Sequence, residues 1–224
     1  AVVAVGRGVR EGGQGARAEL SQAAAEELDV PVNQVQMILA DTSLVPDDGI
    51  TAGSGTTPRT VPAVRQGAAA ARKLLIDVAC MQWETVRTAV TMRDGKVVDT
   101  ANRRSFSYAD LAKNPEAAKL FQQAIPSNIE LTAVNNWKVL GTPVLRPNAG
   151  SIVIGAHKYP SDVARPGMLY GKILRAPAYG AKLVSVDLAM AKSMKDVTVV
   201  QDGSFVGVAA PNSFRAILAL AAIS

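Results

Sequence analysis

Residues 11–75 read EGGQGARAELSQAAAEELDVPVNQVQMILADTSLVPDDGITAGSGTTPRTVPAVRQGAAAARKLL and carry the strongest structural signals of the chain. They contain two glycine-rich loops, and each loop leads directly into a run of strong helix formers. In the first run, residues 16–29, apolar side chains recur at helical spacing. They are Leu20, Ala23, Ala24 and Leu28. A second and longer helix is predicted over residues 61–83, and strands are predicted over residues 1–5 and 35–40.

The remainder of the chain mixes helices and strands. Asp94-Gly95 between two apolar runs predicts a hairpin, and short helices are predicted at 107–111 and 115–125. Residues 126–149 are rich in Asn and Pro, which is typical of a connection. Beyond residue 150, strands are predicted at 152–159, 168–177, 181–187, 197–201 and 205–210, and helices at 188–194 and 213–223. Because the elements do not alternate regularly, the fold class is predicted to be α+β.

Composition excludes several classes of protein. The 224 residues carry a net charge of +5 but no long basic run, so a nucleic-acid surface is not expected. No apolar run has the length of a membrane span. Cys80 is the only cysteine and His157 the only histidine, which excludes a disulfide framework and a Cys/His zinc site. Cys80 lies in an apolar helical run and is expected to be a buried thiol.

The first glycine-rich loop is Glu11-Gly-Gly-Gln-Gly15. Its glycines let the backbone approach a ligand closely. The helix start that follows offers unpaired N–H groups to an anion. The Gln14 amide can both donate and accept, so it can orient a polar group. The alternative is a tight turn without a ligand, which the spacing alone favours.

The second loop is Thr51-Ala-Gly-Ser-Gly-Thr-Thr57, directly before the long helix. Its hydroxyls and free amides suit a phosphate. The alternative is a flexible loop with Thr57 or Thr60 as the helix cap. Two such loops about 40 residues apart, each leading into a helix, favour one shared anionic ligand. A nucleotide-binding enzyme is a weaker alternative. It would need a pair of acidic residues to bind a metal ion, and the pair Asp47-Asp48 is expected to lie in a solvated loop.

Residues 11–75 resemble the molybdopterin-binding region of the xanthine dehydrogenase and aldehyde oxidase family. In that family a Gly-Gln-Gly turn, a helix, a strand ending in Asp-Thr and a Gly-Ser-x-Ser/Thr loop occur in this order, as they do here. The resemblance implies that Gln14, flanked by Gly13 and Gly15, lies beside the molybdenum without binding it. It also implies that the loop Gly53, Ser54, Gly55 and Thr56 holds the pterin and its phosphate.

The last part of the chain resembles the α/β hammerhead domain of the same enzymes. The motifs that carry this resemblance lie around Gly155–Tyr159, Pro166–Gly171, Arg175–Pro177 and Asp187. The predicted organisation is therefore a partial molybdopterin-binding domain over 1–125, a connection over 126–149 and a truncated hammerhead domain over 150–224. Pro166-Gly167 and Pro177 are expected to set turns, and Arg175 is expected to form a structural ion pair.

The order of these regions is similar to that in the beta subunit of isoquinoline 1-oxidoreductase. The resemblance implies oxidation of an N-heterocycle or an aldehyde with water as the oxygen source. It also implies a molybdenum-pterin cofactor, expected as the cytosine dinucleotide, and a small two-iron, two-sulfur partner subunit with an additional cytochrome c subunit in some relatives. A periplasmic parent subunit is expected, with a cytoplasmic one as the alternative.

One departure from the family affects the activity expected of this chain. The family's general-base glutamate lies in a Gly-x-Gly-Glu turn, and no such turn occurs here. Glu11 precedes the Gly-Gln-Gly turn and is not that base. The chain by itself is therefore expected to be an inactive fragment with little or no cofactor. The alternative function is a non-catalytic assembly module without cofactor, for which no groove lined by both loops is predicted.

Overall fold

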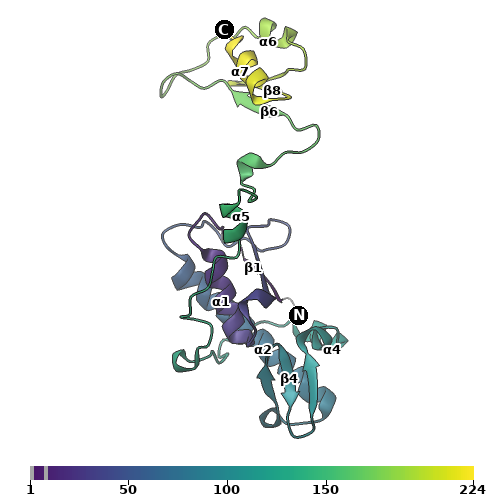
Figure 1. Cartoon of the computed structure of the whole chain (residues 1–224). Helices are drawn as coiled ribbons and strands as arrows, with labels where there is room; N and C mark the ends of the chain where they lie inside the picture. The colour runs from purple at the N-terminus through teal and green to yellow at the C-terminus, as the bar shows by residue number, and fades with distance from the viewer. Residues whose placement is uncertain (1–2, 8–9) are drawn as a thin grey trace. The chain divides into compact units, whose positions relative to one another are not determined.

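The computed structural model describes residues 3–7 and 10–224, with side chains described from Arg10 onward. The chain divides into two compact units, Ala1–Ala156 and His157–Ser224. Figure 1 shows the secondary structure of each unit. The predicted domain limits at 125 and 150 remain predictions, although residues 126–149 lie within the first of these two units.

The first unit begins with a strand–helix–strand arrangement. Strand β1 (Val3–Arg7) runs parallel to β2 (Val35–Leu39), with Val3 opposite Val35. Helix α1 (Ala16–Leu28) connects them, followed by the 3₁₀ turn η1 (Val32–Gln34). A crossover helix is the usual way to join two parallel strands. The helix predicted over 16–29 and the strand predicted over 35–40 are confirmed to within one residue. Of the strand predicted over 1–5, residues 3–5 are confirmed, and residues 1–2 lie outside the described residues.

Helix α2 (Val61–Trp83) packs against α1 and follows a single π-helical turn, η2 (Thr56–Thr60). Figure 1 shows the two helices side by side. Both contribute alanines to their contact, and small side chains let helix backbones approach closely. The buried positions on these two helices include Leu20, Ala23, Ala24, Leu28, Val64, Ala68, Leu75 and Val78. This core fixes where the two glycine-rich loops lie, because each loop precedes one of the two helices.

A three-stranded antiparallel sheet follows α2 and the 3₁₀ turn η3 (Arg87–Ala89). Its strands are β3 (Thr91–Arg93), β4 (Lys96–Asp99) and β5 (Arg104–Ser107). The predicted hairpin is confirmed: Asp94 and Gly95 both have positive φ, at 50° and 72°, as a type I′ turn requires. Strand β5 is not among the predicted elements, because RSFS has too few apolar residues to show alternation.

Two short helices follow this sheet. Helix α3 (Tyr108–Ala112) is capped by the Ser107 side chain and α4 (Pro115–Leu120) by the Asn114 side chain. The Trp83 ring at the end of α2 stacks on Phe106 of β5, with centroids 4.7 Å apart. Cys80 was expected to be a buried thiol, and it is only half-buried, packed beside the core.

The segment after α4 is tied to α1 by two buried carboxylates. Glu26 accepts the backbone N–H groups of Lys138, Val139 and Leu140 at 2.6–3.1 Å. Glu27 accepts the N–H and hydroxyl of Thr132 and pairs with Arg65 at 2.6 Å. The turn η4 (Val134–Asn136) lies between these anchors, and the Trp137 indole N–H donates to the Thr132 carbonyl at 3.2 Å. The predicted connection is therefore held firmly on the first unit.

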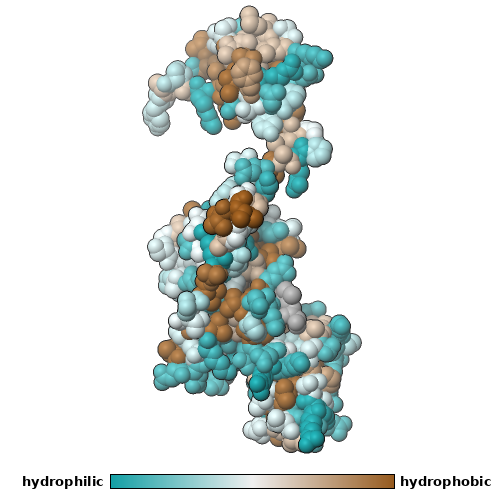
Figure 2. All heavy atoms as spheres, viewed as in Figure 1, coloured by the Kyte–Doolittle hydropathy of each residue, from teal (hydrophilic) through white to brown (hydrophobic). Residues whose placement is uncertain are grey.

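The second unit contains an antiparallel sheet with the order β6-β8-β7. Its strands are β6 (Tyr170–Ile173), β7 (Thr198–Asp202) and β8 (Phe205–Ala210). The helical elements of this unit are η5 (Pro160–Asp162), α6 (Ala189–Ser193) and α7 (Ser213–Ala221). Ala216 and Ala219 of α7 pack on Val208 and Ala210 of β8. Hydrophobic atoms remain on the surface of this unit (Figure 2), including Phe214, which is 68% exposed.

Two predicted strands are wrong. Residues 152–159 contribute instead to helix α5 (Ala149–Val153) and a turn at Gly155, whose φ is 70°. Residues 181–187 are largely extended, but they join no sheet: a local turn bond lies at Ala181, and Asp187 pairs with Ser224. β-branched side chains favour strands only when a neighbouring strand pairs with them. In the described part of the chain, neither stretch has such a neighbour, and Val153 and Val184 are exposed.

Candidate functional site: the cleft between the two glycine-rich loops

A cleft of about 490 Å³ in the first unit is lined by both glycine-rich loops. Its lining residues are Arg10, Glu11, Gly12, Gln14, Thr51, Ala52, Ser54, Gly55 and Thr56. Two hydrogen bonds tie the second loop to the residues that flank the first. The Arg10 backbone N–H donates to Thr51 Oγ1 at 2.9 Å, and the Thr57 hydroxyl donates to Glu19 Oε1 of α1 at 2.5 Å. Segments about 40 residues apart in the sequence therefore form one continuous polar site.

The Gln14 turn depends on its glycines. Gly13 and Gly15 have φ of 108° and 88°, which residues with a side chain rarely adopt. The Gln14 amide bridges the turn: its Oε1 accepts the Gly12 N–H and its Nε2 donates to the Arg10 carbonyl, both at 2.7 Å. Both ends of the amide are thus used to hold the loop that carries it.

Glu11 fills the N-terminal end of α1. Its Oε1 accepts the N–H groups of Gly13 and Gly15 at 2.9 and 3.0 Å, and its Oε2 accepts that of Arg17 at 2.9 Å. Arg146 pairs with Oε1 at 3.2 Å. Burial by itself raises the pKa of Glu11, but the three amide bonds and the Arg146 charge outweigh it and leave the pKa below its usual value. The expectation that this helix start offers unpaired N–H groups is therefore wrong for Gly15 and Arg17, whose N–H groups Glu11 already accepts.

The second loop is more open. Gly53 and Ser54 have φ of 63° and 52°, which turns the Ser54 backbone into the left-handed region. Within the part of the chain that the structure describes, the hydroxyls of Ser54 and Thr56 form no hydrogen bond to a protein group. These hydroxyls are available to a ligand.

The start of α2 agrees only in part with the alternative prediction that Thr57 or Thr60 caps this helix. Thr60 occupies the N-cap position of the helix, but its side chain forms no capping hydrogen bond. The Thr57 hydroxyl is bonded to Glu19 of α1 and caps nothing. The Thr57 hydroxyl therefore ties the second loop to α1 instead of capping α2.

Arg10 and Arg59 supply positive charge near the second loop. Arg10 lines the cleft, and Arg59 lines a hollow of about 90 Å³ beside it. The Arg59 guanidinium lies against Gly55, where an added Cβ would be only 2.0 Å from Nη2. Guanidinium groups, hydroxyls and backbone N–H groups are the donors that phosphate prefers. The cleft is therefore suited to a phosphorylated polar ligand.

The predicted site residues are partly brought together. Gln14, Ser54, Gly55 and Thr56 line the cleft, whereas Gly13, Gly15 and Gly53 shape the turns beside it. Their binding roles stay predictions. Arg10 and the role of Glu11 were not predicted from the sequence, although a carboxylate just ahead of a helix start is a recognisable signal.

Acidic residues elsewhere do not form a metal site. Asp47 Oδ1 accepts the Gly49 N–H at 2.8 Å, as in an ordinary Asx turn. Among residues 3–7 and 10–224, no group of three His, Cys, Asp or Glu residues is placed to hold a metal ion. In the same ranges, no helix is both long enough and apolar enough to cross a membrane.

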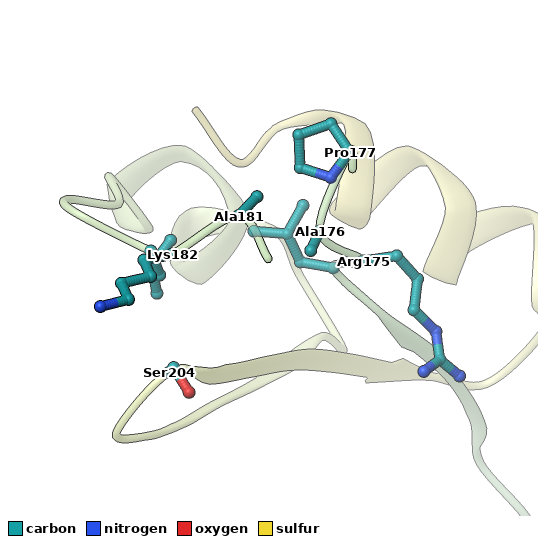
Figure 3. Close-up of a pocket in the computed structure, with 8 residues that line it drawn as sticks. Arg175, Ala176, Pro177, Ala181, Lys182 and Ser204 are labelled. Atoms are coloured by element: carbon teal, nitrogen blue, oxygen red, sulfur yellow. The ribbon is translucent and has the colours of Figure 1, made fainter. Parts of the chain in front are cut away.

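A larger hollow of about 610 Å³ lies in the second unit, beside Arg175, Pro177, Lys182 and Ser204. Figure 3 shows that the charged ends of Arg175 and Lys182 point away from each other. They do not converge on a common ligand. Arg175 forms no ion pair with any described residue, so the ion pair expected for it is wrong. The polar chemistry is concentrated in the cleft of the first unit.

Comparison with known proteins identifies the class. A family model described as "Molybdopterin cofactor-binding domain" matches residues 2–163, which is most of the chain. The chain belongs to this family. The resemblance found in residues 11–75 is thereby confirmed, and the two loops that form the cleft lie within the matched residues.

Three curated relatives are similar to the chain. A nicotinate dehydrogenase subunit of Pseudomonas putida is 31% identical over 218 residues, covering 92% of this chain and 18% of the relative. The beta subunit of isoquinoline 1-oxidoreductase from Brevundimonas diminuta is 26% identical over 83% of this chain and 28% of the relative. A probable xanthine dehydrogenase subunit of Bacillus subtilis is 43% identical over 56 residues, covering 25% of this chain and 8% of the relative. The chain spans less than a third of the length of these relatives.

Solved structures match more weakly. A Cu,Mo-CO dehydrogenase aligns with a TM-score of 0.41 and 21% identity over 47% of this chain and 14% of its own. Quinoline 2-oxidoreductase from Pseudomonas putida 86 aligns with a TM-score of 0.40 and 20% identity over 57% of this chain and 16% of its own. At these scores the alignments add nothing to the family assignment.

Proposed function

We propose that this chain is part of the large subunit of a molybdenum-pterin hydroxylase, and that the cleft between its two loops holds part of the cofactor. The family membership supports a molybdenum-pterin cofactor. The observation that carries the proposal is that Gln14 and the loop from Thr51 to Thr56 line a single cleft. The alternative, an assembly module without cofactor, gives no reason to expect such a cleft.

The donors of the cleft fit the chemical groups of that cofactor. Ser54 and Thr56 offer hydroxyls without a partner among the described residues, and Arg10 and Arg59 offer positive charge for phosphate oxygens. After its two bonds to the loop, the Gln14 amide keeps one N–H donor and one oxygen lone pair, which would orient the polar groups nearest the metal. When bound, the cofactor supplies the redox chemistry, while the protein orients and insulates it.

Several properties of the whole protein are proposed from the family resemblance rather than from this cleft. The substrate class would be an N-heterocycle or an aldehyde, with water as the oxygen source. The cofactor would be the cytosine dinucleotide form. The electron acceptors would be a two-iron, two-sulfur subunit and a cytochrome c subunit, in a periplasmic complex. The second unit, with its antiparallel sheet and α7, would be the truncated hammerhead domain.

The test uses the intact parent subunit with Gln14→Ala and a control, Gln123→Ala, at an exposed position away from the cleft. If Gln14 lies beside the metal, turnover should fall by roughly 10² or more, because misplaced groups in an active site are costly. The control should keep its turnover and molybdenum content. Unchanged turnover and metal content in Gln14→Ala would remove Gln14 from the site.

Metal and pterin analysis of the purified parent protein separates the two candidate functions. The proposed function requires molybdenum and a phosphorylated pterin at close to one per subunit. The assembly module requires neither. The Ser54→Ala, Thr56→Ala double variant should lower the pterin content without unfolding the protein, since neither hydroxyl has a partner among the described residues.

A further inference from the structure

The N-terminal end of α1 already contains an anion, and that anion is a side chain of this protein. The first N–H groups of a helix lack partners within the helix and attract negative charge. Here the Glu11 carboxylate accepts three of the N–H groups around that end, from Gly13, Gly15 and Arg17. Its side chain is only 12% exposed.

We propose that Glu11 is a positioning residue: its carboxylate serves as the resident anion of α1, fixes the turn that carries Gln14 and closes this helix end to the cofactor's phosphate. The part of the proposal that concerns Gln14 rests on the proposed function. The part that concerns the resident anion does not.

The hydrogen bonds of Glu11 span the Gln14 turn. One carboxylate oxygen holds the amides on both sides of Gln14, at Gly13 and Gly15, and the other reaches Arg17 in the first turn of α1. Glycines gain flexibility because they lack a side chain, so a turn with two positive-φ glycines needs other contacts to keep one shape. Glu11 provides them from outside the turn.

The charge of Glu11 is matched from a distant segment. Arg146, 135 residues further along the chain, approaches Glu11 Oε1 at 3.2 Å and also donates to Asn148. A buried carboxylate is stable only when hydrogen bonds and a partner charge compensate for lost hydration. With three amides and one guanidinium, Glu11 meets both conditions as an ionised group.

This arrangement directs an incoming phosphate to the second loop. At the start of α1, phosphate would find the Gly15 and Arg17 amides occupied and a negative charge in place. At the second loop it would find the hydroxyls of Ser54 and Thr56, with Arg10 and Arg59 nearby. The two loops therefore have separate tasks, one to orient Gln14 and the other to hold the anionic tail.

The resident-anion part is tested by chemical rescue in the full 224-residue chain. Glu11→Ala should lower the thermal unfolding midpoint by roughly 5 °C, from a lost set of charge-assisted hydrogen bonds. Acetate should restore roughly half of that loss relative to chloride at equal ionic strength, because it can occupy the vacated position. Wild type and the exposed control Glu130→Ala should not respond to acetate.

Two results would overturn this part. One is a Glu11→Ala midpoint equal to that of wild type, and the other is a lowered midpoint that acetate and chloride affect equally. If Glu11→Ala does not fold, Glu11→Gln decides, because it keeps the shape and one acceptor oxygen. It should unfold roughly 2–3 °C below wild type at neutral pH, and a midpoint equal to wild type would refute the proposal.

Electron paramagnetic resonance of the half-reduced metal in the molybdenum-loaded parent protein tests the positioning part. Glu11→Gln should retain molybdenum but show a changed spectrum, since Gln14 would be displaced. A residue that only stabilises the fold would lower the metal content without changing the spectrum. Full metal content with an unchanged spectrum refutes the positioning role alone, whereas a wild-type parent protein without molybdenum refutes the proposed function.

Discussion

The two glycine-rich loops line one cleft but differ in how their polar groups are satisfied. In the first loop, the side chains of Glu11 and Gln14 are both bonded to the loop's own backbone. In the second loop, the hydroxyls of Ser54 and Thr56 have no partner among the described residues. A loop that is satisfied internally keeps its shape without a ligand, and a loop with free donors is completed by one. This difference fits the proposed division of roles, in which the first loop orients Gln14 and the second binds the phosphate.

The largest effect on stability should come from distorting the backbone of the first loop, Glu11–Gly15. Gly15→Val places a β-branched side chain at a φ of 88° and should lower the free energy of unfolding by about 2 kcal/mol or more. Chemical denaturation measures this. The matched control is Gly12→Ala, where an added Cβ would be 3.5 Å from Gln14 Oε1, an ordinary contact. Equal losses in the two variants would show that backbone conformation is not what shapes the loop.

Acid should remove the stabilising contribution of Glu11 to the first loop. The pKa of Glu11 is lower in the folded protein than its usual 4.5, so its contribution is complete above that value and is lost as the pH falls through the lowered pKa. The stability difference between wild type and Glu11→Gln should therefore shrink below pH 4.5. Comparing the two proteins at each pH cancels the titration of other carboxylates, such as Asp99, whose pKa is about 2. A difference that stays constant down to acid unfolding would contradict the assignment.

The stability of the second loop should not depend on the Thr56 hydroxyl. Thr56→Ala should change the free energy of unfolding by less than about 0.5 kcal/mol, because no hydrogen bond to a described residue is lost. In the parent subunit the same change should reduce the pterin content. Thr57→Ala is the contrasting variant, since it removes the 2.5 Å bond to Glu19, and it should cost about 1 kcal/mol. A larger loss of unfolding free energy in Thr56→Ala than in Thr57→Ala would show that the Thr56 hydroxyl is needed by the fold itself.

The smallest effect is expected at Gly55. Its φ is −80°, which any residue adopts, and an added Cβ would meet only the end of the flexible Arg59 side chain. Gly55→Ala should therefore leave the unfolding midpoint within about 1 °C of wild type, because a surface side chain can move aside. A large loss measured by calorimetry would show that the position of Arg59 is rigidly required by the fold.

Local signals in the sequence were sufficient for part of the fold. Strong helix formers with regular apolar spacing placed α1 and α2 within a residue or two, and Asp94-Gly95 placed the hairpin. Prediction failed for residues 152–159 and 181–187, because strand formation depends on a partner that local composition does not reveal. The same limit applied to Glu26 and Glu27. Acidic residues in a helix are usually exposed, and the burial of these two is explained by the returning segment at 132–140 together with the Arg65 partner of Glu27.

For the candidate site, motifs indicated both loops and the turn residues but not their contacts. Gln14, Ser54 and Thr56 were predicted from those motifs, and they do line one cleft. Glu11 was recognised only as a residue that is not the general base. Its pairing with Arg146 joins positions 135 residues apart, a contact that spacing cannot indicate. Electrostatic partners that are distant in the sequence could therefore not be predicted from it.

The distribution of aromatic residues gives the two units separate optical signals. Both tryptophans, Trp83 stacked on Phe106 and Trp137 bonded to the Thr132 carbonyl, belong to the unit Ala1–Ala156. The unit His157–Ser224 contains tyrosine and phenylalanine but no tryptophan. Indole fluorescence in a denaturation experiment will therefore follow the cleft-bearing unit alone, while circular dichroism follows both. Non-coincident transitions from the two probes would reveal that the halves of the chain melt independently.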